Sequence, residues 1–295
     1  MKKISVFFVD SKPFSQLVGL CLLLLFGFLM VVGLQILQPM SQSPAPGAIR
    51  FNLLWMGCSQ LLIFFVPALL FAWLYQRRPA EYLGLDLQGR KWLLALVGAV
   101  VMLLLVPIND WLTYWNEQWQ MGSVEEVLRR QSQQSKELTQ QMLSLTSPGD
   151  LCLQLLVVAL LPAVCEEFFF RGCLQQVLHR WFGNLHVAVA VTAVIFSLAH
   201  GDMYGFVPRL VLGLLLGYLF ALSGSILVNV CAHFFNNAMV VVLYYLYHRG
   251  LVLMDPSEPL FFSWTTTIIC GLAGLMLFLV YFTKIVQKDP KKTKF

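Results

Sequence analysis

Apolar segments long enough to cross a membrane recur along almost the whole chain. There are eight of them, at residues 15–37, 52–75, 92–115, 151–178, 186–200, 207–223, 225–247 and 260–283. A helix of ~20 apolar residues crosses a bilayer. Because lipid offers backbone groups no hydrogen bonds, only helices and closed barrels can span it. The pattern therefore predicts an all-α, polytopic membrane helical bundle of about eight transmembrane helices.

The composition agrees with this fold and excludes several others. The chain is 58% hydrophobic and 12% charged, whereas soluble domains are about 25% charged. Its net charge of +5 is modest, and the basic residues lie at loop ends and in the C-terminal tail. We therefore expect no nucleic acid as a partner. Seven cysteines lie scattered through the apolar segments, which indicates small packing residues rather than a disulfide framework.

The positions of lysine and arginine predict the orientation. Most of the lysine and arginine residues outside the spans lie on the same side of the membrane as the two termini. Cytoplasmic loops carry such an excess of basic residues. We expect an integral membrane protein with N- and C-termini in the cytoplasm, in a prokaryotic plasma membrane. The first span is longer than the 7–15 apolar residues typical of a signal peptide, which predicts a retained helix.

One long polar connection divides the chain. Residues 116–150 are rich in Gln, Glu and Ser, with apolar residues at helical spacing, which is typical of one or two short amphipathic helices at a membrane surface. We expect three regions: 1–147, with three spans and this connection; 148–247, a core of four spans; and 248–295, the last span and a basic cytoplasmic tail.

Three of the core spans carry ionisable or amide side chains at membrane depth. These side chains are Glu166, Glu167 and Arg171 in the fourth span, His200 at the end of the fifth, and His233 and Asn237 in the seventh. With a rise of 1.5 Å per residue, they reach similar depths. Taken alone, the Glu–Arg pair would be interpreted as a structural ion pair. A single Asn would be interpreted as a hydrogen-bonding residue between helices. Together they predict one functional site.

The residue types favour hydrolysis of an amide bond. A carboxylate beside an imidazole can activate water, and a histidine with an asparagine amide can stabilise an oxyanion. The sequence contains no Ser-centred elbow and no His-Glu-x-x-His motif, which disfavours a serine nucleophile and the common zinc-protease helix. A glutamate and two histidines could still bind zinc, so this alternative stays open.

The motifs resemble those of a known family. They read Glu166-Glu167-x-x-x-Arg171, Phe196-x-x-x-His200 and His233-x-x-x-Asn237. In this order they are similar to the CAAX prenyl endopeptidase and bacteriocin-processing (CPBP, Abi) family of intramembrane proteases. The resemblance covers about residues 150–246, roughly the core region.

The resemblance implies a role for each motif residue. Glu166 and His200 would activate the attacking water, and His233 and Asn237 would form the oxyanion site. The supporting residues would be Glu167 and Arg171. We favour a metal-independent glutamate endopeptidase that uses no cofactor. The second interpretation is a zinc ion bound by Glu166, His200 and His233.

The implied partners are membrane lipid and a membrane-tethered or lipidated protein or peptide substrate. Eukaryotic relatives remove the last three residues of prenylated proteins, and many bacterial relatives are linked to bacteriocin immunity or peptide processing. One alternative is a non-catalytic immunity or scaffold protein of the same fold. A transporter is less favoured, because the sequence shows no internal symmetry. Pro67, Pro107 and Pro162 could kink their helices, although for Pro162 we favour an ordinary membrane-helix proline.

Overall fold

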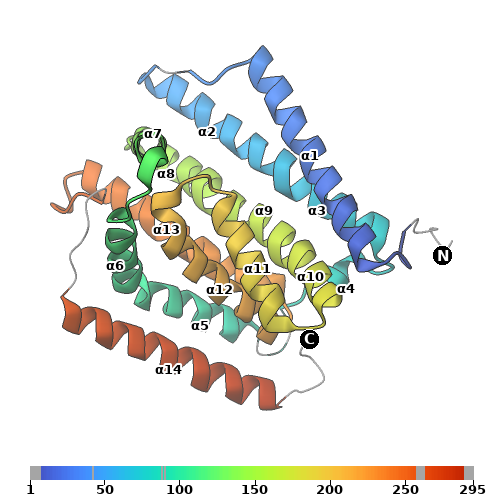
Figure 1. Ribbon diagram of the computed structural model, residues 1–295. Helices are drawn as coiled ribbons and strands as arrows, with labels where there is room; N and C mark the ends of the chain where they lie inside the picture. Colours follow the sequence, from blue (N-terminus) through green and yellow to red (C-terminus); the bar gives the residue numbers. More distant parts are fainter. Residues whose placement is uncertain (1–7, 42, 88, 90, 257–262, 289–295) are drawn as a thin grey trace.

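Every regular element in the described part of the chain is helical. The computed structural model describes residues 8–41, 43–87, 89, 91–256 and 263–288. Its α-helices are α1 (Pro13–Leu37), α2 (Pro46–Gln60), α3 (Val66–Tyr75), α4 (Pro79–Leu83), α5 (Lys91–Leu104), α6 (Val106–Glu117), α7 (Glu125–Met142), α8 (Pro148–Gln154), α9 (Leu161–Phe169), α10 (Gln175–Phe182), α11 (Leu185–Leu198), α12 (Phe206–Ser223), α13 (Ile226–His248) and α14 (Trp264–Lys288). Figure 1 shows that α13 lies in the middle of the bundle and α14 lies along its outside.

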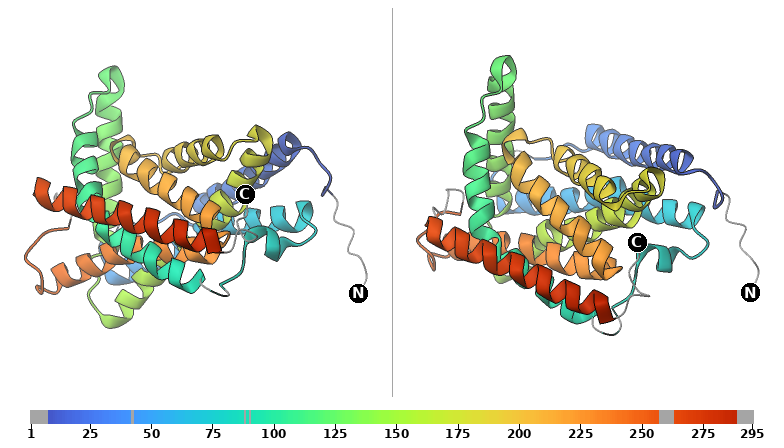
Figure 2. Two further views of the ribbon diagram at one scale, coloured as in Figure 1. Left: turned by 90° about the horizontal axis from the view of Figure 1, so that it is seen from below. Right: turned by 60° about the horizontal axis from the view of Figure 1, so that its bottom comes forward.

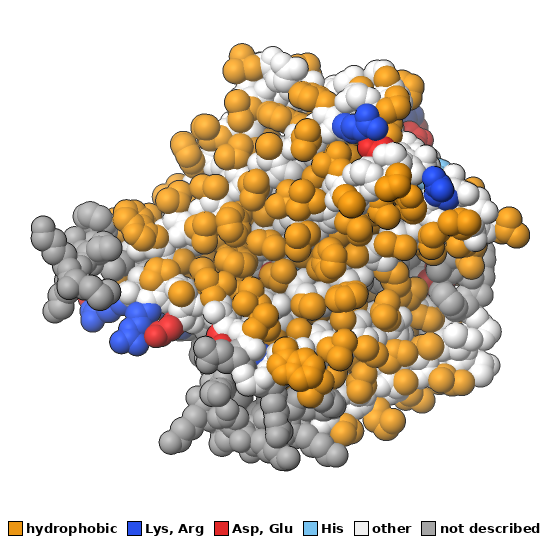
Figure 3. Space-filling model, turned by 180° about the vertical axis from the view of Figure 1, so that it is seen from behind, with side chains coloured by type: hydrophobic (Ala, Val, Ile, Leu, Met, Phe, Trp, Pro, Cys, Tyr) orange, Lys and Arg blue, Asp and Glu red, His pale blue; other side chains and the backbone are white. Residues whose placement is uncertain are grey.

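The helices have the lengths and composition of a membrane bundle. Five stretches are long and apolar enough to cross a bilayer: Pro13–Leu37, Pro46–Tyr75, Pro148–Phe182, Met203–Ser223 and Ile226–His248. A bent pair, α5 with α6, is a sixth candidate, and α11 and Trp264–Val280 are shorter apolar helices. Together they match the eight predicted spans. Hydrophobic side chains cover most of one face, with charges at its edges (Figure 3), as expected of an integral membrane protein.

The third predicted span is not a single straight helix. It breaks at Leu105, and α5 and α6 meet at 47°. Pro107 lies at the start of α6; it has no amide hydrogen, and its ring clashes with the carbonyl four residues earlier. The predicted span over 92–115 is therefore present as a bent pair of helices, with the bend beside Pro107.

The polar connection forms one helix of 18 residues, α7, rather than two short ones. Helices α6 and α7 lie side by side and project from the bundle (Figure 2). Lys136 of α7 joins Glu117 of α6, with 2.5 Å between Nζ and Oε1. On the other side of α7, the Gln131 amide donates to the Gly201 carbonyl at 2.8 Å. Helix α7 therefore connects α6 to the loop that follows α11.

Three π-helical turns shape the long helices. One, Leu155–Leu160, directly precedes the turn with Pro162, and another, Leu61–Phe65, precedes Pro67. A π turn carries one extra residue and accommodates the hydrogen bond that proline cannot donate. The third, Phe170–Leu174, contains Arg171. Such turns often mark functional sites, and here two of them flank the Glu166–Glu167 pair.

Aromatic packing sets the distance between the core helices. Phe168, Phe169 and Phe170 are all buried. The Phe170 ring meets the Phe196 ring of α11 edge-on, with 5.1 Å between centroids. Each buried phenyl ring removes a large apolar surface from solvent or lipid, and edge-to-face pairs add to that packing. This contact holds α11 against the π-helical turn Phe170–Leu174 that follows α9, and so brings the second motif beside Arg171 of the first.

Candidate active site

A fully buried ion pair lies at the centre of the bundle. Glu167 and Arg171 have no exposed surface, and Arg171 Nη1 lies 2.5 Å from Glu167 Oε1. They are four residues apart, so both project from one face of their helix. Arg171 also donates to the Gly213 carbonyl at 3.1 Å and lies over the Phe196 ring, 4.6 Å from its centroid. Charges inside a membrane are tolerated when paired in this way.

The same carboxylate holds two side chains of α13. Asn229 donates to Glu167 Oε2 at 3.0 Å, and His233 Nδ1 lies 2.9 Å from Glu167 Oε1. Because an ionised carboxylate only accepts hydrogen bonds, Nδ1 carries the proton. Asn229 also donates to the Leu216 carbonyl of α12 at 2.7 Å. These contacts fix the His233 ring, and Nε2 is the atom turned toward Glu166.

Glu166 has a different environment although it is the next residue. Its side chain is nearly buried, and its Oε2 lies 3.9 Å from His233 Nε2. That distance is too long for a direct hydrogen bond, and one water between the two atoms fits it. Within the described residues, Glu166 accepts no hydrogen bond from another side chain. A carboxylate oxygen of Glu166 therefore remains available as a hydrogen-bond acceptor, and it faces the fixed imidazole of His233.

His200 follows the last turn of α11 and is exposed. Its Nδ1 lies 2.8 Å from the Phe196 carbonyl oxygen. Because a carbonyl only accepts, Nδ1 must be the donor, which leaves a lone pair on Nε2 when the ring is neutral. His200 is within electrostatic range of Glu166 and His233, although it forms no ion pair with Glu166 in the described part. The structure thus brings all three motifs to one place.

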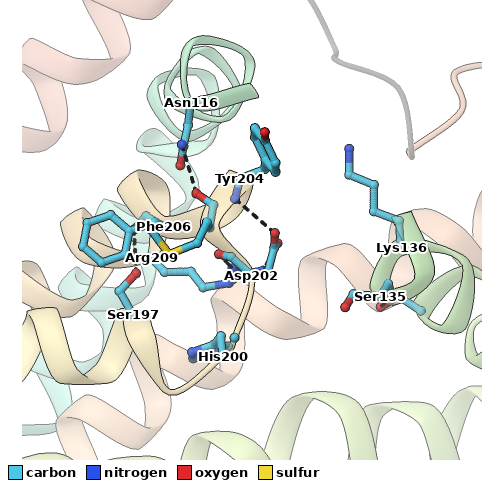
Figure 4. A network of polar contacts seen from close by, with 12 residues as sticks. Asn116, Ser135, Lys136, Ser197, His200, Asp202, Tyr204, Phe206 and Arg209 are labelled. Atoms are coloured by element: carbon cyan, nitrogen blue, oxygen red, sulfur yellow. Dashed lines mark hydrogen bonds and ion pairs between the residues drawn. The ribbon is translucent and has the colours of Figure 1, made fainter. Parts of the chain in front are cut away.

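The loop after His200 is held on both sides (Figure 4). The Asp202 carboxylate accepts from Arg209 at 3.0 Å. Asn116, at the end of α6, accepts from the Val207 amide at 2.8 Å and donates to a carbonyl of the same loop. Asn116 is fully buried. These contacts fix the chain that carries His200, and no motif in the sequence indicated Asn116.

The third motif continues along α13. Asn237 lies one turn after His233, and both project from the same side of the helix. Asn236 donates to Asn237 Oδ1 at 3.1 Å. With its oxygen engaged in this contact, Asn237 presents its NH2 group to a bound molecule. The half-buried position of Asn237 is consistent with a group that contacts substrate.

Close packing of α11 and α12 was not recognised from the sequence. Arg171 donates to the Gly213 carbonyl, and Gln175, one turn later, donates to the Gly217 carbonyl at 3.0 Å. A methyl group on Gly217 would lie 2.7 Å from the Val189 side chain. The spacing Gly-x-x-x-Gly is the usual sign of such close approach of membrane helices. Gly213 and Gly217 have this spacing, so the close packing could have been recognised in the sequence.

A metal site requires several ligand side chains close together. A catalytic zinc site uses three protein ligands. In the described ranges, no group of three or more His, Cys, Asp or Glu side chains is placed to hold a metal ion. The zinc alternative with Glu166, His200 and His233 therefore stays a prediction.

Comparison with known families identifies the core. Residues 148–239 match the model of the family described as type II CAAX prenyl endopeptidase Rce1-like. The match covers about a third of the chain and contains all three motifs. No curated protein and no solved structure matches the chain. Residues 148–239, which carry Glu166, His200 and His233, are therefore similar to the Rce1-like family of type II CAAX prenyl endopeptidases.

Proposed function

We propose that this protein hydrolyses a peptide bond of a membrane-tethered or lipidated protein, with Glu166 and His200 activating water. The observation that carries the proposal is the contrast between Glu167, whose oxygens accept three hydrogen bonds, and Glu166, whose carboxylate faces the His233 ring without a direct hydrogen bond. Glu166 keeps its acceptor oxygens available 3.9 Å from His233 Nε2, whereas Glu167 is used by three donors. A general base needs such an available oxygen within reach of a water molecule.

Water attack requires a proton acceptor and a second contact for alignment. The Glu166 carboxylate takes the proton as the water oxygen bonds to the substrate carbonyl carbon. The lone pair on His200 Nε2 accepts the other water hydrogen and directs the oxygen lone pair at the carbon. The proton held by Glu166 then passes to the leaving amine, so the carboxylate is regenerated. This mechanism forms no covalent intermediate with the protein.

The carbonyl oxygen gains negative charge in the transition state, and two donors on α13 stabilise it. Asn237 offers its NH2 group. His233 donates through Nε2, and because Glu167 engages Nδ1, this role uses the doubly protonated ring. Fixed donors of this kind stabilise the oxyanion more than mobile water does, because they need no reorganisation.

The test is proteolysis of membrane-tethered fluorogenic peptides by the purified protein in detergent. Glu166→Gln is the test variant, and Glu126→Gln on the exposed face of α7 is the matched control. Cleavage that is lost only in Glu166→Gln and resists a chelator supports a metal-independent glutamate protease. Activity that a chelator removes and zinc restores would place a metal at Glu166, His200 and His233. Absence of cleavage of every peptide would favour the non-catalytic scaffold.

A further inference from the structure

A cavity of about 680 Å3 lies on the other side of α13 from the carboxylates. Helices α5, α6, α12 and α13 form its walls, and α7 contributes to its mouth. Its volume is within the range of ~300–1,000 Å3 typical of ligand sites. The residues that line it include none of Glu166, Glu167, His200 and His233. The mechanism above therefore leaves this cavity without a role.

The cavity reaches the catalytic helix at Asn236. Asn236 lines its wall and donates to Asn237 Oδ1 at 3.1 Å. Consecutive helical residues point about 100° apart, so α13 presents His233 and Asn237 toward α9 and Asn236 toward the cavity. A molecule bound in the cavity would therefore lie next to the amide that we place at the oxyanion.

The inner part of the cavity is apolar. It is lined by Met102 and Leu105 near the break between α5 and α6, by Leu212 of α12, and by Val240 and Leu243 of α13. Such a wall favours apolar side chains, because their burial removes hydrocarbon from water. The bend between α5 and α6 separates these two helices where the inner part begins.

The mouth is rich in amide and hydroxyl groups, supplied by Asn109, Thr113, Gln133 and Gln140. These side chains donate and accept hydrogen bonds, which is what the backbone of a bound peptide requires. Thr113 and Gln133 already donate to the Asn109 carbonyl and to Glu137, but a plain hydrocarbon chain would separate the Asn109 and Gln140 side chains from water at a cost in free energy. Glu117 and Lys136 also line the cavity and neutralise each other, and Asp110 is the third charged residue of its lining.

We propose that this cavity is a subsite for an apolar peptide segment of the substrate, a few residues long, on one side of the scissile bond. The inference rests on the proposed function. The apolar side chains of the segment fill the inner part, its backbone bonds to the amides at the mouth, and the scissile carbonyl lies beside Asn237. Substrate specificity is then set by α6 and α13, away from the carboxylates.

The test compares two tryptophan variants on one helix. Val240 lines the cavity, whereas Val242, of the same type and similarly exposed, does not. The substrates are two series of membrane-tethered fluorogenic peptides, each with one scissile bond. Peptides of the Leu series carry four Leu residues next to that bond, and peptides of the Ser series carry four Ser residues. In each series the four residues stand before the bond in one peptide and after it in another. We expect wild type and Val242→Trp to prefer a Leu series by about tenfold or more in kcat/KM. Val240→Trp should lose that preference through a higher KM for the Leu series.

A second readout separates this inference from the proposed function. A Leu peptide with one photo-reactive Phe analogue is cross-linked to wild type and to Glu166→Gln. We expect label on α6 or α13 at the cavity wall and less label in Val240→Trp; Val240→Phe replaces that variant if it does not fold. If no peptide is cleaved but the wall is labelled, the proposed function fails and the subsite stands. Three results would overturn the subsite. They are equal cleavage of the Leu and Ser series by wild type, peptide label on residues away from the cavity wall, and label of the wall by a photo-reactive fatty acid only.

Discussion

Two neighbouring carboxylates in this protein have opposite surroundings. Glu167 faces the interior, where Arg171, Asn229 and His233 use both of its oxygens. Glu166 faces His233 Nε2 across 3.9 Å and keeps its oxygens available. The comparison shows how a helix can hold a rigid support and a reactive group at adjacent positions, because consecutive side chains point about 100° apart. Active sites need both parts: a fixed shell and a group that is poised to react.

The largest expected difference is between Glu166→Gln and Glu167→Gln. Glu166→Gln should lower kcat by roughly 10³-fold or more, since a general base contributes ~10²–10⁴, while the Tm stays near that of wild type. Glu167→Gln should lower both Tm and activity, because Arg171 and His233 lose a charged partner. Peptide cleavage and thermal unfolding in detergent measure the two quantities. An active Glu166→Gln variant would remove Glu166 from water activation.

The buried pair should respond strongly to loss of one partner. Arg171→Met leaves the Glu167 charge buried without its cation, which costs about 3–5 kcal/mol in the free energy of unfolding. The double variant Glu167→Leu with Arg171→Met should recover most of that stability and remain inactive, because His233 then lacks its acceptor. Unfolding curves of wild type and of these two variants test this. Restored activity in the double variant would mean that the orientation of His233 does not depend on Glu167.

The oxyanion donors should affect rate rather than binding. Asn237→Ala should lower kcat by roughly 10²–10³-fold with little change in KM. Asn236→Ala, the comparison at the preceding residue, should lower kcat less, since Asn236 holds the Asn237 amide oxygen and lines the cavity but does not contact the oxyanion. Steady-state kinetics on one peptide measure both constants. A rise in KM alone would assign Asn237 to substrate binding instead.

The smallest effect is expected at the contact between α11 and α12. In Gly217→Ala, the added methyl group would lie 2.7 Å from Val189, and such overpacking typically costs about 1–3 kcal/mol. Gly33→Ala is the control, because no atom lies within 4 Å of the position of its added methyl group. Thermal unfolding compares the two. Equal Tm values would show that α11 and α12 can separate without loss, and that Gln175 does not depend on this contact.

Much of the site could be predicted from the residues alone. The Glu167–Arg171 pair follows from a spacing of four on a helix. The stripe of Asn229, His233 and Asn237 follows from the same period, and the matched depths follow from the rise per residue. The apolar segments predicted the bundle, and Pro107 predicted the break in the third span. These features are local, so the order of residues along one helix is sufficient to find them.

Other features depend on contacts between distant segments. The carbonyls of Gly213 and Leu216 accept from Arg171 and Asn229, and a backbone oxygen carries no mark in the sequence. Asn116 is buried against a loop about ninety residues later. The cavity at Asn236 exists because α5 and α6 bend around α12 and α13. Nothing in a linear pattern could indicate these.

The sequence by itself determined that this chain is a helical membrane protein and which residues make up its candidate site, because hydrophobic length and helical period are properties of one segment. Only the tertiary structure decided that Glu167 also binds Asn229 and His233 of α13, while Glu166 keeps its oxygens available. The physical reason is that pairing inside a membrane depends on which donors neighbouring helices bring within hydrogen-bonding distance, and those helices come from far along the chain.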